Sequence, residues 1–404
     1  MAKRRILLVV SGGIAAYKTP ELVRALVKAG HAVRCVLTQA AQQFVAPLAL
    51  QAVSSEPVRS ALFDLTEESR IGHIELADWA EVALVAPASA DFLAKLAHGL
   101  ADDLPSTVLL ATRAPVVVAP AMNVNMWSHP ATQANVSTLR GRGVHVIGPD
   151  AGELACGWEG LGRMSEPAEI AGQLELLLAP KSLADVRVVV TAGGTREPLD
   201  PVRAITNRSS GKMGFALAAE AALRGAECVL IAGVSSQPTP MGVTRVDVAS
   251  ALDMRAAVLR EQTNAQIVVM AAAVADFRPS SAASRKIKKE DLAEGERLTL
   301  ELVANPDILA EISRERGARI VVGFAAESHD VLAAARRKLA RKGCDLLVAN
   351  DISRSDAGFE SDANAVLLLT PDGEVEELPL LPKSEVAARI FDRIEKLREG
   401  KRAS

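Results

Sequence analysis

The sequence predicts an α/β protein built from two Rossmann-like units in tandem. Short β-branched runs alternate with Ala/Leu-rich helical stretches from the N-terminus onward, which is typical of a parallel sheet covered by helices. The alternation stops at a Leu-rich helix and a polar connector, and then restarts with a new strand and a Gly-rich turn. The length of 404 residues agrees with this duplication, because domains average roughly 100 to 200 residues.

In the first unit we predict strands at 6–10, 32–37, 82–86 and 116–119. A helix is predicted at 17–29, where Gly30 ends it. The strands are continuous apolar runs, so we expect each to be buried on both faces. A last helix, at 174–178, ends before Pro180, and the polar stretch 179–185 is the expected connector. This places the units at 1–183 and 184–404.

In the second unit we predict strands at 186–190, 228–232, 267–270, 320–323 and 346–349. A helix is predicted at 212–224, closed by Gly225. An antiparallel edge strand at 365–369 and a charged helix at 383–397 complete the unit. The polar, Lys-rich stretch 280–292 is expected to be a mobile loop.

Composition excludes several classes of protein. Hydrophobic residues make up 49% and charged residues 24%, which is ordinary for a globular chain. A net charge of -3 and an aromatic content of 3% argue against general nucleic-acid binding. The apolar runs are too short for a membrane span or a signal peptide, so a cytoplasmic protein is expected. The four cysteines stand singly, which predicts neither a zinc site nor a disulfide framework.

The turn after the first strand is a candidate anion site. Ser11–Lys18 follows that strand directly, where backbone amides at a helix start can bind phosphate. Gly12 and Gly13 are adjacent, so the GxGxxG fingerprint is absent and a mononucleotide phosphate is the better hypothesis. A tight turn without a ligand remains the alternative. Thr38 and Ser89 follow other strands and add hydroxyl groups at the same sheet edge.

Three further segments of the first half contain chemically useful side chains. Met122 and Asn123 follow the strand at 116–119, although Asn123 could equally be a helix N-cap. Cys156 lies in the four-glycine segment 152–164, which we expect to fold as a loop over a ligand. His73 is placed at the start of a short helix, where a lone histidine is usually structural.

The strings SGGIAAYK, GHIELADWA, PAMNVNMW and ACGWEGLGRM, in this order, resemble the flavin-containing cysteine decarboxylases of the phosphopantothenoylcysteine type. The resemblance implies FMN bound by Ser11, Gly12, Gly13, Ile14, Thr38 and Ser89, with trimers that place each site between subunits. It implies flavin-dependent oxidation of the cysteine moiety to a thioaldehyde, loss of CO2 and return of a hydride. It also implies that His73 is the base or orients the substrate and that Cys156 donates the final proton. Met122 and Asn123 are the implied substrate contacts, with Asn123 holding the substrate carboxylate.

The second half repeats the pattern with different chemistry. The stretches 191–200 and 207–214 both offer backbone amides to phosphate. Gly211-Lys212 suggests a P-loop, but Thr206 stands in place of the first glycine and Met213 in place of the Mg2+-binding hydroxyl, so that interpretation is rejected. Asp276 follows a strand, and four cations lie in 285–289. Charge runs are usually solvated surface, but a basic loop beside a strand-end carboxylate also suits a triphosphate.

This half resembles the phosphopantothenate-cysteine ligases, through TAGGTREPLDPVR, ITNRSSGKMG, AAVADFRP, KIKK, NPDIL, GFAAES and VANDI. The resemblance implies activation of 4'-phosphopantothenate by CTP to an acyl-cytidylate, attack by the amine of L-cysteine, and dimeric contacts. It implies that Asn207 holds the acyl intermediate and that Mg2+ sits on the phosphates, with no ligand residue for the metal identified. The CTP contacts that it implies are Asp276, Lys286, Pro306, Asp307, Ile308, Leu309, Phe324, Lys338 and Lys342.

Trimer contacts in the first half, together with dimer contacts in the second half, would build a closed homo-oligomer such as a dodecamer. Two other hypotheses compete with this bifunctional enzyme. A nicotinamide oxidoreductase would use tandem Rossmann units, but both first turns lack GxGxxG. A flavin-binding regulatory or scaffold subunit would keep the fold without chemistry, against which Cys156, His73 and Lys286 argue. Phe324 could equally be a core residue.

Overall fold

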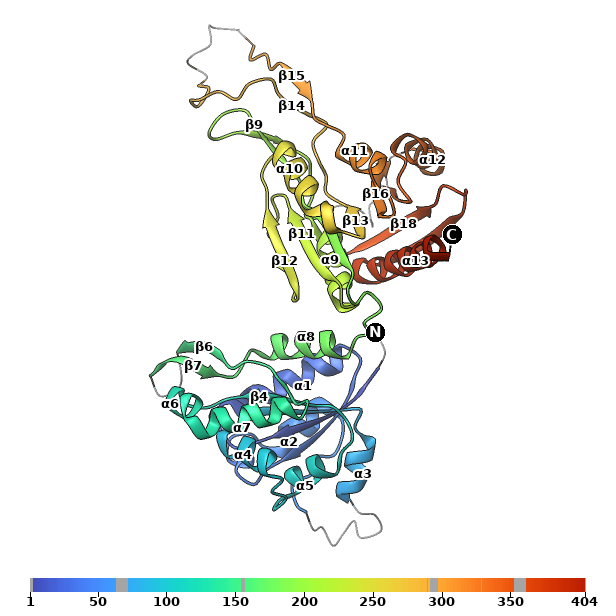
Figure 1. Cartoon of the computed structure of the whole chain (residues 1–404). Coiled ribbons are helices and arrows are strands. Elements are labelled where there is room, and N and C mark those ends of the chain that lie inside the picture. Colours follow the sequence, from blue (N-terminus) through green and yellow to red (C-terminus); the bar gives the residue numbers. More distant parts are fainter. Residues whose placement is uncertain are drawn as a thin grey trace. The chain divides into compact units, whose positions relative to one another are not determined.

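The computed structural model of the chain describes residues 3–62, 72–153, 157–288, 290, 297–327, 329–351 and 361–403. Cys156 and part of the predicted loop at 280–292 lie outside these residues. The chain forms two compact units, Met1–Leu178 and Ala179–Ser404 (Figure 1). The division falls at the start of the predicted connector at 179–185.

The first unit is a five-stranded parallel sheet with helices on both faces. Its strands lie in the order β2-β1-β3-β4-β5, with a separate antiparallel hairpin of β6 and β7. The strands are β1 (Arg5–Val10), β2 (Ala32–Leu37), β3 (Val82–Ala88), β4 (Val116–Pro120), β5 (His145–Val146), β6 (Asp150–Glu153) and β7 (Glu159–Arg163). The apolar runs were predicted to be buried on both faces. Strand β3 confirms this prediction most fully, because it is buried along its whole length.

Alternate residues of the central strands face two separate cores. Ile6, Leu8 and Val10 pack with α1, α2 and α8, whereas Leu7 and Val9 pack with α3, α4, α5 and α7. The helices are η1 (Ile14–Lys18), α1 (Thr19–Lys28), η2 (Ala41–Gln43), α2 (Pro47–Ser54), α3 (Gly72–Trp79), α4 (Ala90–His98), α5 (Leu104–Ala111), α6 (Val124–Ser128), α7 (Pro130–Gly141) and α8 (Pro167–Leu178). The helices are therefore held by burial of their apolar faces.

The second unit contains an eight-stranded sheet in the order β12-β11-β8-β13-β16-β17-β18-β19. Strands β12 to β17 in this order are parallel, while β18 pairs antiparallel with β17 and with β19. The sheet strands are β8 (Arg187–Ala192), β11 (Glu227–Ala232), β12 (Val243–Asp247), β13 (Ile267–Met270), β16 (Ile320–Glu327), β17 (Leu346–Asp351), β18 (Ala363–Leu369) and β19 (Val375–Pro382).

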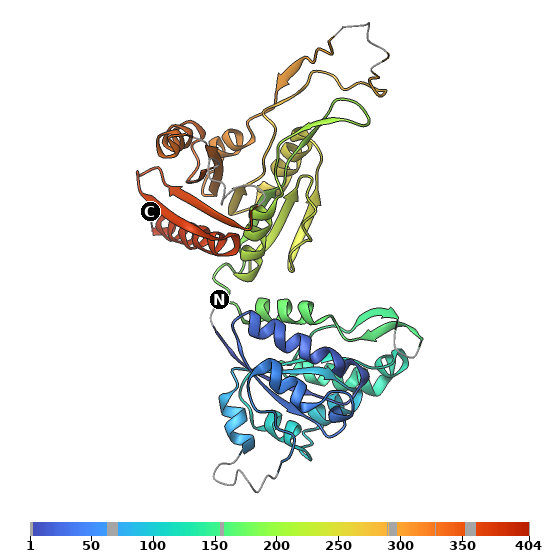
Figure 2. The same cartoon turned by 180° about the vertical axis from the view of Figure 1, so that it is seen from behind.

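Two short antiparallel pairs stand apart from this sheet. They are β9 (Arg196–Pro198) with β10 (Ala204–Thr206), and β14 (Phe277–Pro279) with β15 (Leu302–Ala304). Figures 1 and 2 show β14 and β15 projecting from the sheet of the second unit as an arm.

Helices cover both faces of the second sheet. Helices α9 (Lys212–Leu223) and α13 (Lys383–Ala403) pack on one core, and α10 (Ala251–Glu261), α11 (Ile308–Arg314) and α12 (Val331–Lys342) pack on the other; η4 (Gln262–Asn264) follows α10. The described residues contain no helix that combines the length and the apolar character needed to cross a bilayer.

Three sequence predictions about the fold need correction. The strand predicted at 365–369 is antiparallel, but it is not the edge, because β19 pairs with its outer side. The strand predicted to end at Gly323 continues to Glu327. The segment predicted as a Gly-rich loop at 152–164 forms the β6–β7 hairpin. Glycine, proline and acidic residues hide these strands in the sequence, because such residues are depleted from strands in general.

Candidate active sites of the two units

The hydroxyl group of Ser11 ties together the ends of two neighbouring strands of the first sheet. It donates to the carbonyl oxygen of Pro87 at 2.7 Å and accepts from the backbone N–H of Ser89 at 2.9 Å. Ser11 is buried. Its proton is therefore already used within the protein, so a ligand contact of Ser11 has to use its backbone or its remaining lone pair.

Thr38 and Ser89 hold the turns that follow β2 and β3. The Thr38 hydroxyl accepts from the N–H of Ala41 at 3.1 Å, and the Ser89 hydroxyl caps α4 by accepting from Phe92 at 3.2 Å. These bonds do not use the proton of either hydroxyl, which can be donated to a phosphate oxygen. Because β2, β1 and β3 are adjacent and parallel, the predicted cofactor residues gather at one edge of the sheet.

The turn at Gly12 to Ile14 fits a flavin mononucleotide. At Gly12 a Cβ atom would lie 2.4 Å from the Cβ of Ala40, so only glycine allows this close approach of the two chain segments. At Gly13 a Cβ atom would meet nothing within 4 Å, which leaves the backbone open to a ligand. Ile14 is 58% exposed beside it and offers apolar surface to a flat ring system.

Asn123 caps α6, as one of the two sequence interpretations predicted. Its side-chain oxygen accepts from the N–H of Asn125 at 2.8 Å. The capping bond uses the oxygen, so a role in holding a carboxylate rests on the side-chain NH2 group. Met122 precedes it, at the edge of the sheet where β4 ends.

The β6–β7 hairpin docks directly on this segment. The N–H of Met122 donates to the carbonyl oxygen of Gly162 at 2.9 Å, and a Cβ on Gly162 would lie 2.3 Å from the carbonyl oxygen of Met122. Gly162 has φ 150°, within the range that favours glycine. A Cβ on Gly160 would lie 3.2 Å from both methyl groups of Val124. The glycines therefore set how closely the hairpin approaches α6.

An ion-pair network links the same hairpin to the cofactor turn. Lys18 donates to Glu166 at 2.8 Å, and Arg163 of β7 pairs with the same carboxylate. Hydrogen bonds from Lys18 and then Arg163 hold the pKa of Glu166 below its usual value. In the sequence, Lys18 and Arg163 belong to two separate motifs, and their spacing does not indicate that both contact the Glu166 carboxylate.

We predict that Gly162→Ala displaces the hairpin and slows the final reduction catalysed by the first unit at least tenfold. The added methyl group meets a backbone carbonyl, and overpacking of this kind costs roughly 1–3 kcal/mol. Gly152→Ala is the matched control, because Gly152 lies in the same hairpin and also has positive φ (156°), but a Cβ there would come no closer than 3.4 Å to another atom. Product analysis in which both variants reduce equally fast would contradict the docking argument.

His73 lies in the first turn of α3, as predicted, and is half-buried. Helix α3 packs against α5, and both views show α3 and α6 on opposite sides of the first unit (Figures 1 and 2). Within one copy the structure does not bring His73 to Asn123. A joint role for these two residues therefore requires a second copy of the chain.

The remaining thiols of the first and second units are inert. Cys35, Cys228 and Cys344 are buried, and burial raises the pKa to about 12 for Cys35 and Cys228 and to about 11 for Cys344. A buried thiol with a raised pKa is a small hydrophobe. Among the four cysteines, Cys156 is thus the one left as a chemical candidate.

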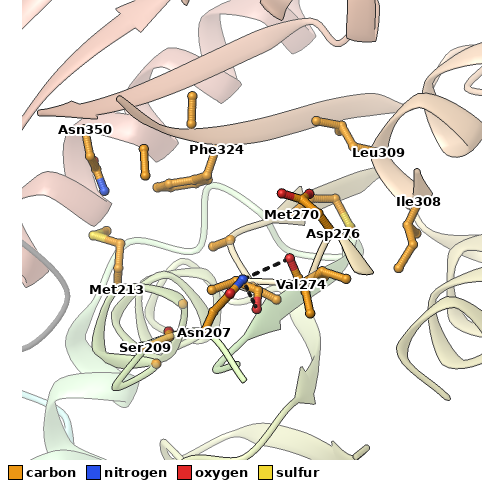
Figure 3. Close-up of a pocket in the computed structure, with 18 of the residues that line it drawn as sticks. Asn207, Ser209, Met213, Met270, Val274, Asp276, Ile308, Leu309, Phe324 and Asn350 are labelled. Carbon is orange, nitrogen blue, oxygen red and sulfur yellow. Dashed lines mark hydrogen bonds between the residues drawn. The ribbon is translucent and has the colours of Figure 1, made fainter. Parts of the chain in front are cut away.

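In the second unit a cavity of about 600 Å³ opens at the carboxyl ends of the parallel strands. In Figure 3, Asn350 and Met213 lie at one end, Ile308 and Leu309 at the other, and Phe324 between them. The residues predicted for the ligase that line it are Asn207, Asp276, Pro306, Asp307, Ile308, Leu309, Phe324, Lys338 and Lys342. The sequence prediction therefore identified much of this wall.

Asn207 is fixed against the turn that follows β13. Its side-chain N–H groups donate to the carbonyl oxygens of Ala273 and Val274, at 3.4 and 3.1 Å (Figure 3). The turn itself is held by Thr195, whose hydroxyl accepts from Ala275 at 3.0 Å, and by Asn305, which donates to the carbonyl oxygen of Ala275 at 2.8 Å. This network presents the Asn207 side chain at the cavity wall.

Asp276 faces the cavity from the segment that follows β13, and Phe324 faces it from β16. Asp276 is exposed just after the β13 turn, and Figure 3 shows its carboxylate directed into the cavity. Phe324 is inside β16 rather than beyond its end. It is half-buried, packs against the core below α9 and also lines the cavity. Phe324 thus contacts the core and also lines the cavity, while its contact with CTP stays a prediction.

The far end of the cavity carries paired charges from α11 and α12. Asp307 caps α11 through the N–H of Ala310 at 3.1 Å and also pairs with Lys342. Burial alone would raise the pKa of Asp307, but Lys342 and the Ala310 amide lower it. Burial lowers the pKa of Lys338, which Glu327 at 3.9 Å partly offsets. The ammonium groups of Lys338 and Lys342 both line the cavity at this end, where they can pair with an anion in place of these carboxylates.

Lys286 does not line this cavity. It borders a separate depression formed with Arg203, Ile287, Lys288 and Glu290. The stretch that carries it is clamped to the turn after β9: the buried Asp200 side chain accepts from the N–H of Ile287 at 3.1 Å and from Arg203 at 2.7 Å. The backbone of Ala283 also donates to Leu199 at 2.9 Å. These described residues are anchored, in contrast to the mobile loop that was expected.

We predict that Asp200→Asn loosens this clamp and lowers the melting temperature of the second unit. Burial alone would raise the pKa of Asp200, but hydrogen bonds from Val202, Arg203 and Ile287 hold it well below the usual value. A lowered folded-state pKa means that the stabilisation is complete above the unfolded pKa of about 3.9 and is lost as pH falls toward the folded pKa. Thermal melts of both proteins should therefore differ at neutral pH, and the difference should shrink progressively as pH falls below about 4 toward the folded-state pKa.

Sequence reasoning missed several residues of the cavity, above all at the Asn350 end. These are Lys212, Arg341, Asn350, Asn364 and Lys383. Asn364 belongs to β18 and Lys383 to α13. Both elements are far from the Gly-rich turns in the sequence. Position after a parallel strand, the signal that singled out Asp276, does not apply to them. Among the described residues, no group of three or more His, Cys, Asp or Glu side chains is arranged to hold a metal ion.

The chain matches two family models in tandem. The flavoprotein family matches residues 1–176, and the C-terminal domain of the DNA/pantothenate metabolism flavoproteins matches residues 183–397. The order of these matches is the order of the two units in the structure.

Known proteins resemble the chain along nearly its whole length. It is 50% identical over 392 residues to the coenzyme A biosynthesis bifunctional protein CoaBC of Vibrio cholerae, covering 97% of this chain and 98% of the relative. Among solved structures, the C-terminal domain of a CoaBC protein is 39% identical, with 55% of this chain and 99% of that chain covered and a TM-score of 0.47. The FMN-binding protein AtHal3 is 35% identical, with 44% and 97% covered and a TM-score of 0.40. The chain therefore belongs to the CoaBC family of bifunctional coenzyme A biosynthesis enzymes, which unite a phosphopantothenoylcysteine decarboxylase with a phosphopantothenate-cysteine ligase.

Proposed function

We propose that the two units catalyse consecutive steps. The second unit joins 4'-phosphopantothenate to L-cysteine with CTP, releasing pyrophosphate and CMP, and the first unit decarboxylates the product to 4'-phosphopantetheine and CO2. The observation that carries this proposal is the match to CoaBC over 97% of the chain, with both family models in order. The choice of CTP rests on this kinship, because the cavity walls give no direct reason for a cytosine base.

In the ligase, positioned charges and amides do most of the work. The cations Lys338 and Lys342 would balance charge on the nucleotide, and Asp276 would accept hydrogen bonds from a hydroxyl group of its sugar. The Asn207 side chain, held at the turn after β13, would orient the acyl intermediate for attack by the cysteine amine. Mg2+ would be held through the phosphate oxygens, which is its usual mode of binding in nucleotide enzymes.

In the decarboxylase, FMN bound at the turn Ser11–Ile14, Thr38 and Ser89 would supply the reversible hydride chemistry. Asn123 would hold the substrate carboxylate until CO2 leaves, and His73 would accept or orient a proton. The hydride taken up in the oxidation would return from the flavin to the ene-thiol, and Cys156 would supply the accompanying proton, so that the overall reaction has no net redox change. The flavoprotein match over residues 1–176 supports this assignment.

We infer that the protein works as a homo-oligomer. Helix α3, which contains His73, and helix α6, which Asn123 caps, lie on opposite sides of one first unit. Lys286 does not line the cavity of its own second unit. Both arrangements are expected if sites are completed by residues from a second copy, in trimers for the first unit and dimers for the second. A cytoplasmic location stays a prediction from the sequence.

The decisive experiment incubates the purified protein with phosphopantothenate, cysteine and each nucleoside triphosphate in turn, and identifies the products. We expect a yellow protein, pyrophosphate only with CTP, and 4'-phosphopantetheine as the final product. Protein that neither retains flavin nor consumes CTP would overturn the proposal. A product that stops at phosphopantothenoylcysteine would overturn the decarboxylase half alone.

A further inference from the structure

The cavity of the second unit has a second cationic end that the predicted ligase residues do not use. Lys212, at the start of α9, and Lys383, at the start of α13, both line the cavity. Lys383 is only 6% exposed, whereas a lysine is rarely buried without a specific role. The two lysines are 171 positions apart in the sequence, and tertiary structure alone brings them together.

The two cationic ends lie on different faces of the same sheet. Helices α9 and α13 pack on one core, and α11 and α12, which carry Asp307, Lys338 and Lys342, pack on the other. The cavity spans the carboxyl edge between them, with Phe324 in the middle (Figure 3). A ligand or ligand pair with anionic groups at two separate positions would match this distribution of charge.

The local contacts show that the two lysines are held close to one another. The Lys212 ammonium donates to the Asp362 carboxylate at 2.6 Å, and the Lys383 ammonium donates to the carbonyl oxygen of Ser361. The backbone N–H of Lys383 donates to the backbone carbonyl oxygen of Asp362 at 3.0 Å. Burial, followed by the charge of Lys212, lowers the pKa of Lys383. The neighbouring charge of Asp362 belongs to a side chain that is 92% exposed. A bound anion between the ammonium groups would relieve their repulsion.

Two amides extend this end of the cavity. Asn364 is buried, and its NH2 group donates to the side-chain oxygen of Asn350 at 3.4 Å. Both residues line the cavity beside the lysines. Ammonium and amide donors around one position suit the oxygen atoms of a phosphoryl group.

Resting on the proposed ligase function, we propose that Lys212 and Lys383 form a phosphoryl-binding end of the ligase cavity, opposite the Lys338 and Lys342 end. The substrates offer two sources of this chemistry: the polyphosphate chain of the nucleotide and the phosphomonoester of phosphopantothenate. Either group carries more than one negative charge near neutral pH, which suits two lysines.

The test compares Lys383→Gln and Lys212→Gln with the full-length parent in pyrophosphate release, measuring KM for each substrate. Charged hydrogen bonds of this kind predict a rise of about 10- to 100-fold in one KM, with a smaller change in kcat. Lys383→Arg should recover part of the loss. Lys396→Gln is the matched control, since Lys396 is an exposed lysine of the same helix.

Two probes separate the sources. If the nucleotide chain binds there, inorganic tripolyphosphate inhibits the parent and loses potency against Lys383→Gln. If the phosphomonoester binds there, Lys383→Gln loses the preference of the parent for phosphopantothenate over pantothenate. Unchanged KM values and unchanged responses to both probes in a folded Lys383→Gln protein would overturn the proposal.

A failure of the proposed ligase function can be distinguished from a failure of the proposed phosphoryl-binding end. Calorimetric titration of the full chain with tripolyphosphate or inorganic phosphate needs no turnover, and binding that is lost in Lys383→Gln would support the phosphoryl-binding end even if the parent consumed no CTP. Melting curves of each variant verify folding, because a buried lysine also contributes packing.

Discussion

Lys286→Gln is expected to reduce pyrophosphate release from CTP and phosphopantothenate by roughly 100- to 1,000-fold, the loss typical of removing one group that stabilises developing charge. Asp200 and Arg203 anchor the stretch around Lys286, so the side chain starts from a fixed backbone. The measurement is the initial rate of pyrophosphate release at saturating substrates. Lys288→Gln, two residues away in the same stretch, is the matched control and should remain active.

Lys286 does not line the cavity of its own chain. A mixing experiment tests whether it acts in the cavity of a second copy. Lys286→Gln and Asn207→Asp are each expected to be inactive alone. If Lys286 acts in the cavity of a second copy, mixed oligomers of the two variants contain an intact site and recover activity. If Lys286 acts within its own chain, mixing restores nothing. Full pyrophosphate release by Lys286→Gln would assign the lysine run to ordinary solvated surface.

Cys156→Ser is expected to release CO2 at close to the parent rate but to slow the final reduction by about 100- to 10,000-fold, because a positioned acid contributes on this order. The oxidised ene-thiol should therefore accumulate. Mass spectrometry of the products, together with CO2 release, separates the two steps in one reaction. Cys35→Ala is the matched control, since the buried Cys35 thiol has a pKa raised to about 12 and cannot serve as the acid.

Gly162→Ala gives an independent check of this role. It keeps Cys156 but displaces the hairpin from Met122, so it should produce a milder form of the same defect. Exclusive formation of the saturated thiol by Cys156→Ser would remove Cys156 from the reduction and would also remove the reason for the Gly162 effect.

The sequence by itself determined the parts of the protein that depend on neighbouring residues. Apolar runs separated by Gly-rich turns predict the order of strands and helices, because burial and turn geometry are local properties of the chain. The residues that directly follow parallel strands, such as Ser11, Thr38 and Ser89, could be named in advance, since all such positions meet at one edge of a sheet.

Only the tertiary structure decided which distant residues share a site. Lys383 joins the ligase cavity because α13 packs on the same face of the sheet as α9, and Gly162 meets Met122 because the hairpin docks on α6. It also separated residues that the motifs had grouped, such as Lys286 from Asp276 and His73 from Asn123. These contacts and separations arise from packing between elements that are far apart in the chain. Such packing produces no periodic pattern in the sequence, so it could not be predicted from the sequence alone.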